Sequence, residues 1–187
     1  RAFGDAGRGL IFPYKLAGSN GPRDYLVETN ARWNGASCQR NLSARTPFGV
    51  SGFTLETSSP KGELTIRMRD TATSETRFFT KVTIFQHKTP LQFDVVVRDD
   101  ISNQTAQIYV QDEYSRSYYF DRPVAQVTIA AKRSNSQQKL LTLDGIALEN
   151  ELSGVIFHAV GVNGAKFQDY VRAKYFALQV AKLQPDL

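Results

Sequence analysis

Alternation of apolar and polar residues is the dominant pattern between residues 53 and 143. Leu64, Ile66 and Met68 alternate with polar residues, which predicts a strand with one buried face. Comparable runs follow one another along this part of the chain, at 53–56, 79–85, 91–97, 106–110, 124–130 and 140–143. Short polar turns separate these runs, so the pattern predicts an antiparallel meander of about seven strands.

Helical periodicity replaces this alternation from Asp144 onward. Helical spacing of apolar residues predicts a first helix containing Leu148, Leu152, Val155, Ile156 and Ala159. The same spacing predicts a second helix from 165 to about 183, with Phe167, Val171, Tyr175 and Leu178 on one face. Gly161 and Gly164 interrupt the pattern, and Asp144 is placed to cap the first helix. A sheet followed by a C-terminal helical hairpin is an α+β fold. Two apolar stripes on the second helix predict an oligomer interface formed by Phe167, Tyr170, Val171, Tyr175 and Leu178.

The N-terminal third carries most of the net charge of +5. Residues 1–52 contain seven basic and three acidic residues, together with many glycines and little periodicity. We therefore expect two parts, an irregular basic arm at 1–52 and one α+β domain at 53–187. Arginine binds phosphate through paired hydrogen bonds, and tryptophan stacks or docks. The predicted contacts to RNA or to a partner protein are Arg23, Arg32, Trp33, Arg40 and Arg45.

Catalytic motifs are missing from the sequence. Cys38 is the only cysteine, so the sequence offers neither an internal disulfide nor a cysteine-based metal cluster. The two histidines, His87 and His158, lie far apart in the sequence and are expected to be structural. The sequence contains no nucleophile elbow and no phosphate loop, and no apolar run is long enough to span a membrane. We expect a protein that is not an enzyme and that uses no cofactor and no metal.

Several motifs near the C-terminus resemble one protein family. Leu143-Asp144, Leu148-Glu-Asn-Glu-Leu152, Gly161-Val-Asn163 and a tyrosine-bearing final helix follow the strands in the order found in the mitochondrial glycoprotein family. This group comprises mitochondrial acidic matrix proteins related to the complement 1q globular-head-binding protein. The resemblance implies a twisted antiparallel sheet of seven strands flanked by helices, a trimeric assembly and a location in the mitochondrial matrix. This chain differs from the family in being basic and in lacking an N-terminal helical pattern. These differences favour a divergent relative of the family, assembled as a homo- or hetero-trimer of related chains.

Three functions are compatible with that resemblance. The first is a non-catalytic structural or assembly component of a large mitochondrial complex, most plausibly the mitochondrial ribosome, with protein subunits and ribosomal RNA as partners. The second is a free mitochondrial RNA-binding or RNA-processing factor that uses the basic arm. The third is an adaptor subunit of a respiratory or ATP synthase complex. The sequence does not choose among them.

Overall fold

Strand β5 (Glu63–Met68) forms as its sequence predicts. Leu64, Ile66 and Met68 are buried, while Thr65 and Arg67 point away from the core. A period of two places alternate side chains on opposite faces of a strand, so β5 covers the core with one face only. Its neighbours extend this arrangement into a layered β-structure, described by a computed structural model that covers residues 4, 6–40, 47–69 and 77–185.

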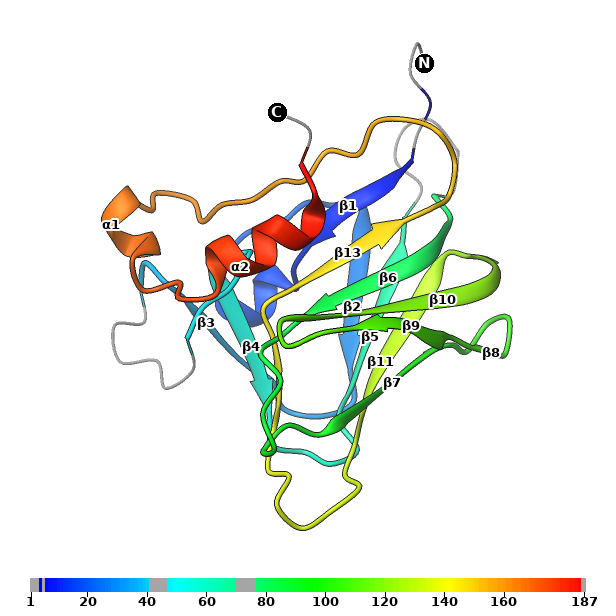
Figure 1. The fold of residues 1–187 in the computed structure, drawn as a ribbon, viewed down its shortest axis with the longest axis horizontal. Helices are drawn as coiled ribbons and strands as arrows, with labels where there is room; N and C mark the ends of the chain where they lie inside the picture. Colours follow the sequence, from blue (N-terminus) through cyan, green and yellow to red (C-terminus); the bar gives the residue numbers. More distant parts are fainter. Residues whose placement is uncertain (1–3, 5, 41–46, 70–76, 186–187) are drawn as a thin grey trace.

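The described strands form three antiparallel sheets (Figure 1). The first sheet has the order β1 (Gly7–Ile11), β13 (Gly145–Glu149), β6 (Phe79–Phe85), β10 (Ser115–Val124) and β9 (Gln107–Gln111). The second has the order β2 (Tyr25–Thr29), β5, β11 (Gln126–Lys132), β7 (Asp94–Asp99) and β8 (Gln104–Thr105). The third has the order β12 (Leu141–Leu143), β4 (Phe53–Thr57) and β3 (Asn34–Ser37).

The main core lies between the first and second sheets, as in a β-sandwich. Val82 and Ile84 of β6 belong to the same buried cluster as Ile66 of β5 and Ile129 of β11. Phe53 of β4 joins this cluster and brings the third sheet into it. Two sheets that share a buried apolar layer hold each other in place, because each removes the apolar face of the other from water.

The outer face of the first sheet is covered near its centre by the C-terminal segment. Phe85 and Ala147 form a second buried cluster, against which Val180 and Leu183 pack. Val180 ends helix α2 (Phe176–Val180), and Leu183 ends the short 3-10 helix η2 (Ala181–Leu183). Figure 1 shows the chain after β13 running along one side of the molecule to α1 (Phe167–Tyr170) and then turning back through α2.

The predicted α+β fold with a C-terminal helical hairpin is wrong. Gly145–Glu149 is strand β13, which lies between β1 and β6, and the described residues 150–160 contain no helix. Ile146 and Leu148 face the main core while Ala147 faces the second cluster, so β13 is buried on both faces and its sequence lacks alternation. Beyond it, helix is limited to α1, α2 and η2 within 165–185.

The prediction of an irregular N-terminal arm is also wrong. Within residues 1–52, β1 pairs with β13, β2 pairs with β5 and β3 pairs with β4. A 3-10 helix, η1 (Tyr14–Ala17), connects β1 to the loop before β2. The sequences of β1 and β3 show no strand pattern, because glycine interrupts both and arginine also interrupts β1, whereas the run of β2 is compatible with a brief strand. No break in the sheets separates 1–52 from 53–187 in the described part of the chain. No helix among the described residues is long and apolar enough to cross a membrane.

Candidate binding site

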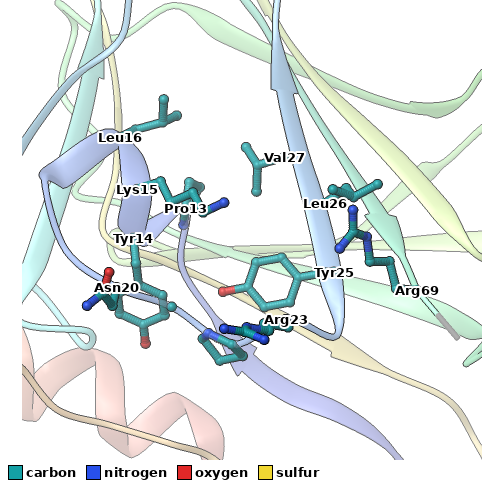
Figure 2. A pocket seen from close by; sticks show the side chains of 12 residues that line it. Pro13, Tyr14, Lys15, Leu16, Asn20, Arg23, Tyr25, Leu26, Val27 and Arg69 are labelled. Atoms are coloured by element: carbon teal, nitrogen blue, oxygen red, sulfur yellow. The ribbon is translucent and has the colours of Figure 1, made fainter. Parts of the chain in front are cut away.

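A pocket of about 550 Å³ lies beside η1 and the free edge of β2. We call it the basic pocket. It is lined by Pro13, Tyr14, Lys15, Leu16, Asn20, Gly21, Pro22, Arg23, Tyr25, Leu26, Val27 and Arg69. Figure 2 shows the Tyr25 ring in the middle of these side chains, with Tyr14 and Arg69 on opposite sides of it. Its volume falls within the roughly 300–1,000 Å³ of sites that bind small ligands.

The loop between η1 and β2 is held against an aromatic ring. Gly18, at φ 66°, ends η1 in the left-handed conformation that glycine adopts without strain. Gly21 lies directly against Tyr14, because a Cβ atom at this position would lie 2.8 Å from a carbon of that ring. The Tyr14 ring in turn makes an edge contact with Phe53 at a centroid distance of 5.2 Å. The loop is therefore positioned by the sandwich core.

Tyr25 forms a fixed wall of the basic pocket. Its hydroxyl group donates a hydrogen bond of 2.7 Å to the backbone carbonyl of Phe12, and the residue is buried. Burial raises the pKa of Tyr25 above its ordinary value, so the phenol stays protonated. Burial likewise raises the pKa of Tyr14. Neither phenol supplies a negative charge to the pocket at neutral pH.

The electrostatic character of the pocket comes from three cations. Lys15, Arg23 and Arg69 line it, and no acidic residue is among the described residues that line it. The nearby carboxylate of Asp24 is engaged elsewhere: Arg8 donates a hydrogen bond to it, and Arg77 lies 3.6 Å away. Among the described residues, none of the three cations forms an ion pair. Within the described part of the chain, the pocket therefore carries net positive charge.

Strand pairing brings two of these cations together from distant parts of the sequence. Tyr25 of β2 is paired with Met68 of β5, and the amide of Arg69 donates to the carbonyl of Asp24. Arg23 and Arg69 consequently lie at the same end of the sheet edge. The charge pattern of the sequence points to Arg23 but not to Lys15, Asn20 or Arg69 as contact residues, because the sequence does not show the register of β2 on β5.

A second pocket of about 640 Å³ adjoins the basic pocket. We call it the neutral pocket. Both pockets are lined by Tyr14, Asn20, Gly21 and Pro22, and the remaining walls of the neutral pocket are Ser19, Phe53 and residues 157–163. The shared loop is thus a ridge between two adjacent depressions.

His158 of the neutral pocket is held as an uncharged imidazole. Its Nδ1 accepts a hydrogen bond of 3.2 Å from the backbone N–H of Leu10, so the ring proton lies on Nε2. Burial lowers the pKa of His158, which keeps the ring neutral near pH 7.

The other residues predicted to contact RNA or a partner do not gather around the pocket. Arg32 is exposed and donates to Asn34, and Arg40 donates to the carbonyl of Gly18. Trp33 is a core residue, with its indole N–H bonded to the carbonyl of Glu63. Arg45 lies outside the described residues.

The predicted oligomer interface divides into exposed and packed residues. Phe167 and Val171 are the most exposed, at 99% and 80%, and Leu178 is 46% exposed. Tyr170 accepts a hydrogen bond from the amide of Val162, and Tyr175 stacks on His87 at a centroid distance of 4.5 Å. Only part of this set is therefore a free surface of the described chain.

The remaining reactive side chains serve structural contacts. His87 Nε2 lies 3.2 Å from Glu113, while its Nδ1 lies 3.1 Å from the hydroxyl group of Tyr175. Cys38 is fully buried, and burial raises the pKa of its thiol. No group of three or more His, Cys, Asp or Glu residues within the described ranges is arranged to hold a metal ion.

Comparison with known proteins gives similarity only at the level of solved structures. No protein-family profile matches the chain, and no curated protein does. A structure of the Streptococcus pneumoniae beta-galactosidase BgaA matches with a TM-score of 0.46 and 6% identity, covering 71% of this chain and 100% of that one. The family 32 CBM of C. perfringens NanJ, in complex with galactose, matches at 0.40 and 10%, covering 67% and 93%. The CBM32 of AlyQ, in complex with 4,5-unsaturated mannuronic acid, matches at 0.40 and 15%, covering 72% and 95%. At these scores the likeness does not establish what this chain binds.

The resemblance to the mitochondrial glycoprotein family is wrong, since the β-sandwich differs from that fold. The residues that carried it, Leu143 to Leu152 and Gly161 to Asn163, form strands, bends and a turn instead of a helical hairpin. The functions inferred from it fall with it: a component of the mitochondrial ribosome, an RNA-binding factor and an adaptor subunit. The same correction applies to the predicted partners, a trimer of related subunits and ribosomal RNA. The predicted location in the mitochondrial matrix is not tested by the structure.

Proposed function

We propose that this chain is a carbohydrate-binding module whose basic pocket binds an acidic sugar. The observation that carries this proposal is the charge of the pocket, whose described lining combines Lys15, Arg23 and Arg69 with no acidic residue. A guanidinium group presents paired N–H donors in a plane, which matches the two oxygens of a carboxylate. A ligand carrying one carboxylate group would compensate part of this charge.

Two further features favour a sugar over a simple anion. The amide of Asn20 offers both donors and an acceptor, and sugar hydroxyl groups also donate and accept. The ring of Tyr14 and the side chains of Leu16 and Val27 supply apolar walls for the C–H faces of a pyranose. A hydroxyl-rich ring with one carboxylate, as in a uronic acid, uses both kinds of group.

The proposal is one of binding without catalysis. Hydrolysis of a glycosidic bond ordinarily uses two carboxyl groups on either side of that bond. The described residues that line the basic pocket include no carboxyl group, imidazole or thiol. The pocket offers cations, an amide and phenols with raised pKa values, which bind and orient a ligand.

A titration followed by NMR tests the proposal, with methyl β-D-glucuronide and its uncharged analogue methyl β-D-glucoside as ligands. Arg23→Ala and Arg69→Ala each remove a charge-assisted hydrogen bond worth about 1.5–3 kcal/mol, so each variant is expected to bind the glucuronide about tenfold or more weakly. Arg122→Ala is the matched control, because Arg122 is exposed on β10 and lines neither pocket. Equal binding of glucuronide and glucoside by the natural chain, or glucuronide binding that survives both pocket substitutions, would refute the proposal.

A further inference from the structure

The basic and neutral pockets differ in charge although they share a wall. The basic pocket has three cations among its lining residues. Among the described residues that line the neutral pocket there is no Asp, Glu, Lys or Arg, and the titratable ones are His158 and Tyr14. A positively charged pocket next to an uncharged one would be matched by a ligand in which a negatively charged unit adjoins an uncharged unit.

The ridge between the pockets is narrow enough to be shared by one ligand. Tyr14, Asn20, Gly21 and Pro22 line both depressions, so a group in one pocket is separated from a group in the other by a single short turn. Gly21 packs onto the ring of Tyr14, where an added Cβ atom would come within 2.8 Å. The absence of a side chain at Gly21 allows the turn to pack this closely on Tyr14.

The neutral pocket has the side chains for an uncharged sugar. Phe157 lines it and is 76% exposed, which leaves aromatic surface available to the apolar face of a pyranose. Nε2–H of His158 has no hydrogen-bond partner among the described residues, and the amide of Asn163 is exposed. These groups fit hydroxyl or acetamido groups, which both donate and accept hydrogen bonds.

We infer that the two pockets bind adjacent units of one saccharide chain, an acidic unit in the basic pocket and an uncharged unit in the neutral pocket. The ligand class is therefore an acidic heteropolysaccharide, in which uronic acids adjoin neutral or N-acetylated sugars. The inference rests on the proposed function. A polymer of uronic acids alone fits less well, because its second carboxylate would enter a pocket without a cation and lose hydration without a partner.

The test compares four ligands by NMR titration: methyl β-D-glucuronide, methyl N-acetyl-β-D-glucosaminide, the disaccharide of glucuronic acid and N-acetylglucosamine, and digalacturonic acid. The mixed disaccharide is expected to bind roughly tenfold more tightly than either methyl glycoside and than digalacturonic acid. Phe157→Ala should reduce its affinity to that of methyl β-D-glucuronide and leave binding of that monosaccharide unchanged. Phe167→Ala is the matched control, because Phe167 is 99% exposed and lines neither pocket.

The outcomes separate this inference from the proposed function. Digalacturonic acid binding as tightly as the mixed disaccharide, or no loss with Phe157→Ala, overturns the inference while the basic pocket stands. Failure of every acidic ligand to bind overturns the proposed function. In that case methyl N-acetyl-β-D-glucosaminide still tests the neutral pocket: shifts of the amides of Gly161, Val162 and Asn163 support it as a sugar site, and their absence overturns it.

Discussion

Asp144 is a buried carboxylic acid whose protonation should govern the pH dependence of stability. It lies between β12 and β13 and is 2% exposed. Its Oδ2 accepts a hydrogen bond of 2.8 Å from the amide of Gln179, whose Oε1 accepts another from the backbone N–H of Val50. Burial raises the pKa of Asp144 to about 7, although the Gln179 amide and the Thr54 hydroxyl group act to lower it. We predict that Asp144→Asn stabilises the fold at neutral and higher pH.

The expected magnitude follows from the two pKa values. The unfolded carboxyl group releases its proton near 3.8, and the folded one releases it near 7. Between these values the folded state binds more protons, so stability is lost as the pH rises from about 4 to about 7, and the loss is complete above that range. The difference corresponds to about 4 kcal/mol. Asparagine has a similar shape and does not titrate, so the variant escapes this loss.

Urea unfolding at several pH values between 4 and 8, followed by the fluorescence of Trp33, measures the effect. The unfolding free energy of Asp144→Asn relative to the natural chain should rise by about 4 kcal/mol from pH 4 to pH 8. Asp100→Asn is the control. Although burial opposes it, hydrogen bonds from Thr128 and Arg98 lower the pKa of Asp100 below its ordinary value of 3.8, so its stabilising contribution is lost only at more acidic pH. The unfolding free energy of Asp100→Asn relative to the natural chain should therefore stay nearly constant between pH 4 and pH 8. If the difference in unfolding free energy between Asp144→Asn and the natural chain stays constant from pH 4 to pH 8, the raised pKa of Asp144 is refuted as the cause.

Further predictions concern packing and hydrogen bonding. Gly49→Ala should destabilise the fold by about 1–3 kcal/mol, because its Cβ atom would lie 2.0 Å from Oε1 of Gln179 and 2.6 Å from Cβ of Asp144; an unchanged melting temperature would contradict this contact. Trp33→Phe should cost about 1 kcal/mol through loss of the indole hydrogen bond to the Glu63 carbonyl. Thermal unfolding by circular dichroism measures both, and a Trp33→Phe variant as stable as the natural chain would show that this hydrogen bond contributes nothing.

The sequence predicts strands where one face meets the core and the other meets water. The strand containing Leu64, Ile66 and Met68 is confirmed as β5, and the run at 79–85 is confirmed as β6. Alternation is an incomplete guide at the edge of a sheet. Ile108 and Val110 alternate as predicted, yet both are exposed in β9, an edge strand whose pairing with β10 contains a register shift.

The C-terminal error has a physical cause. Leu148, Leu152 and Val155 have helical spacing, but Leu148 is buried in β13 while Leu152 and Val155 are exposed. Burial of β13 on both faces removes the period of two that would have revealed a strand. Asp144, expected as a helix cap, is instead the buried partner of Gln179. Such long-range pairing depends on tertiary contacts that no local pattern contains.

The candidate site was predictable only in part for the same reason. Arg23 was identified from its charge and its glycine-rich surroundings. Its association with Arg69 depends on the pairing of Tyr25 with Met68, which joins two distant segments. The neutral pocket depends on residues 157–163 lying against the turn at 19–22, which requires the whole sandwich.

The pairing of β1 with β13 has a consequence for synthesis of the chain. Leu10 is paired with Ala147, so β1 finds its partner only after all the residues between them have been made. During translation, Leu10, Ile11 and Phe12, all buried in the finished fold, have no β13 to cover them. Closing such a long loop is also slow, since its entropic cost precedes the contacts that offset it. The N-terminal strand is therefore the segment whose protection by a chaperone during synthesis would matter most.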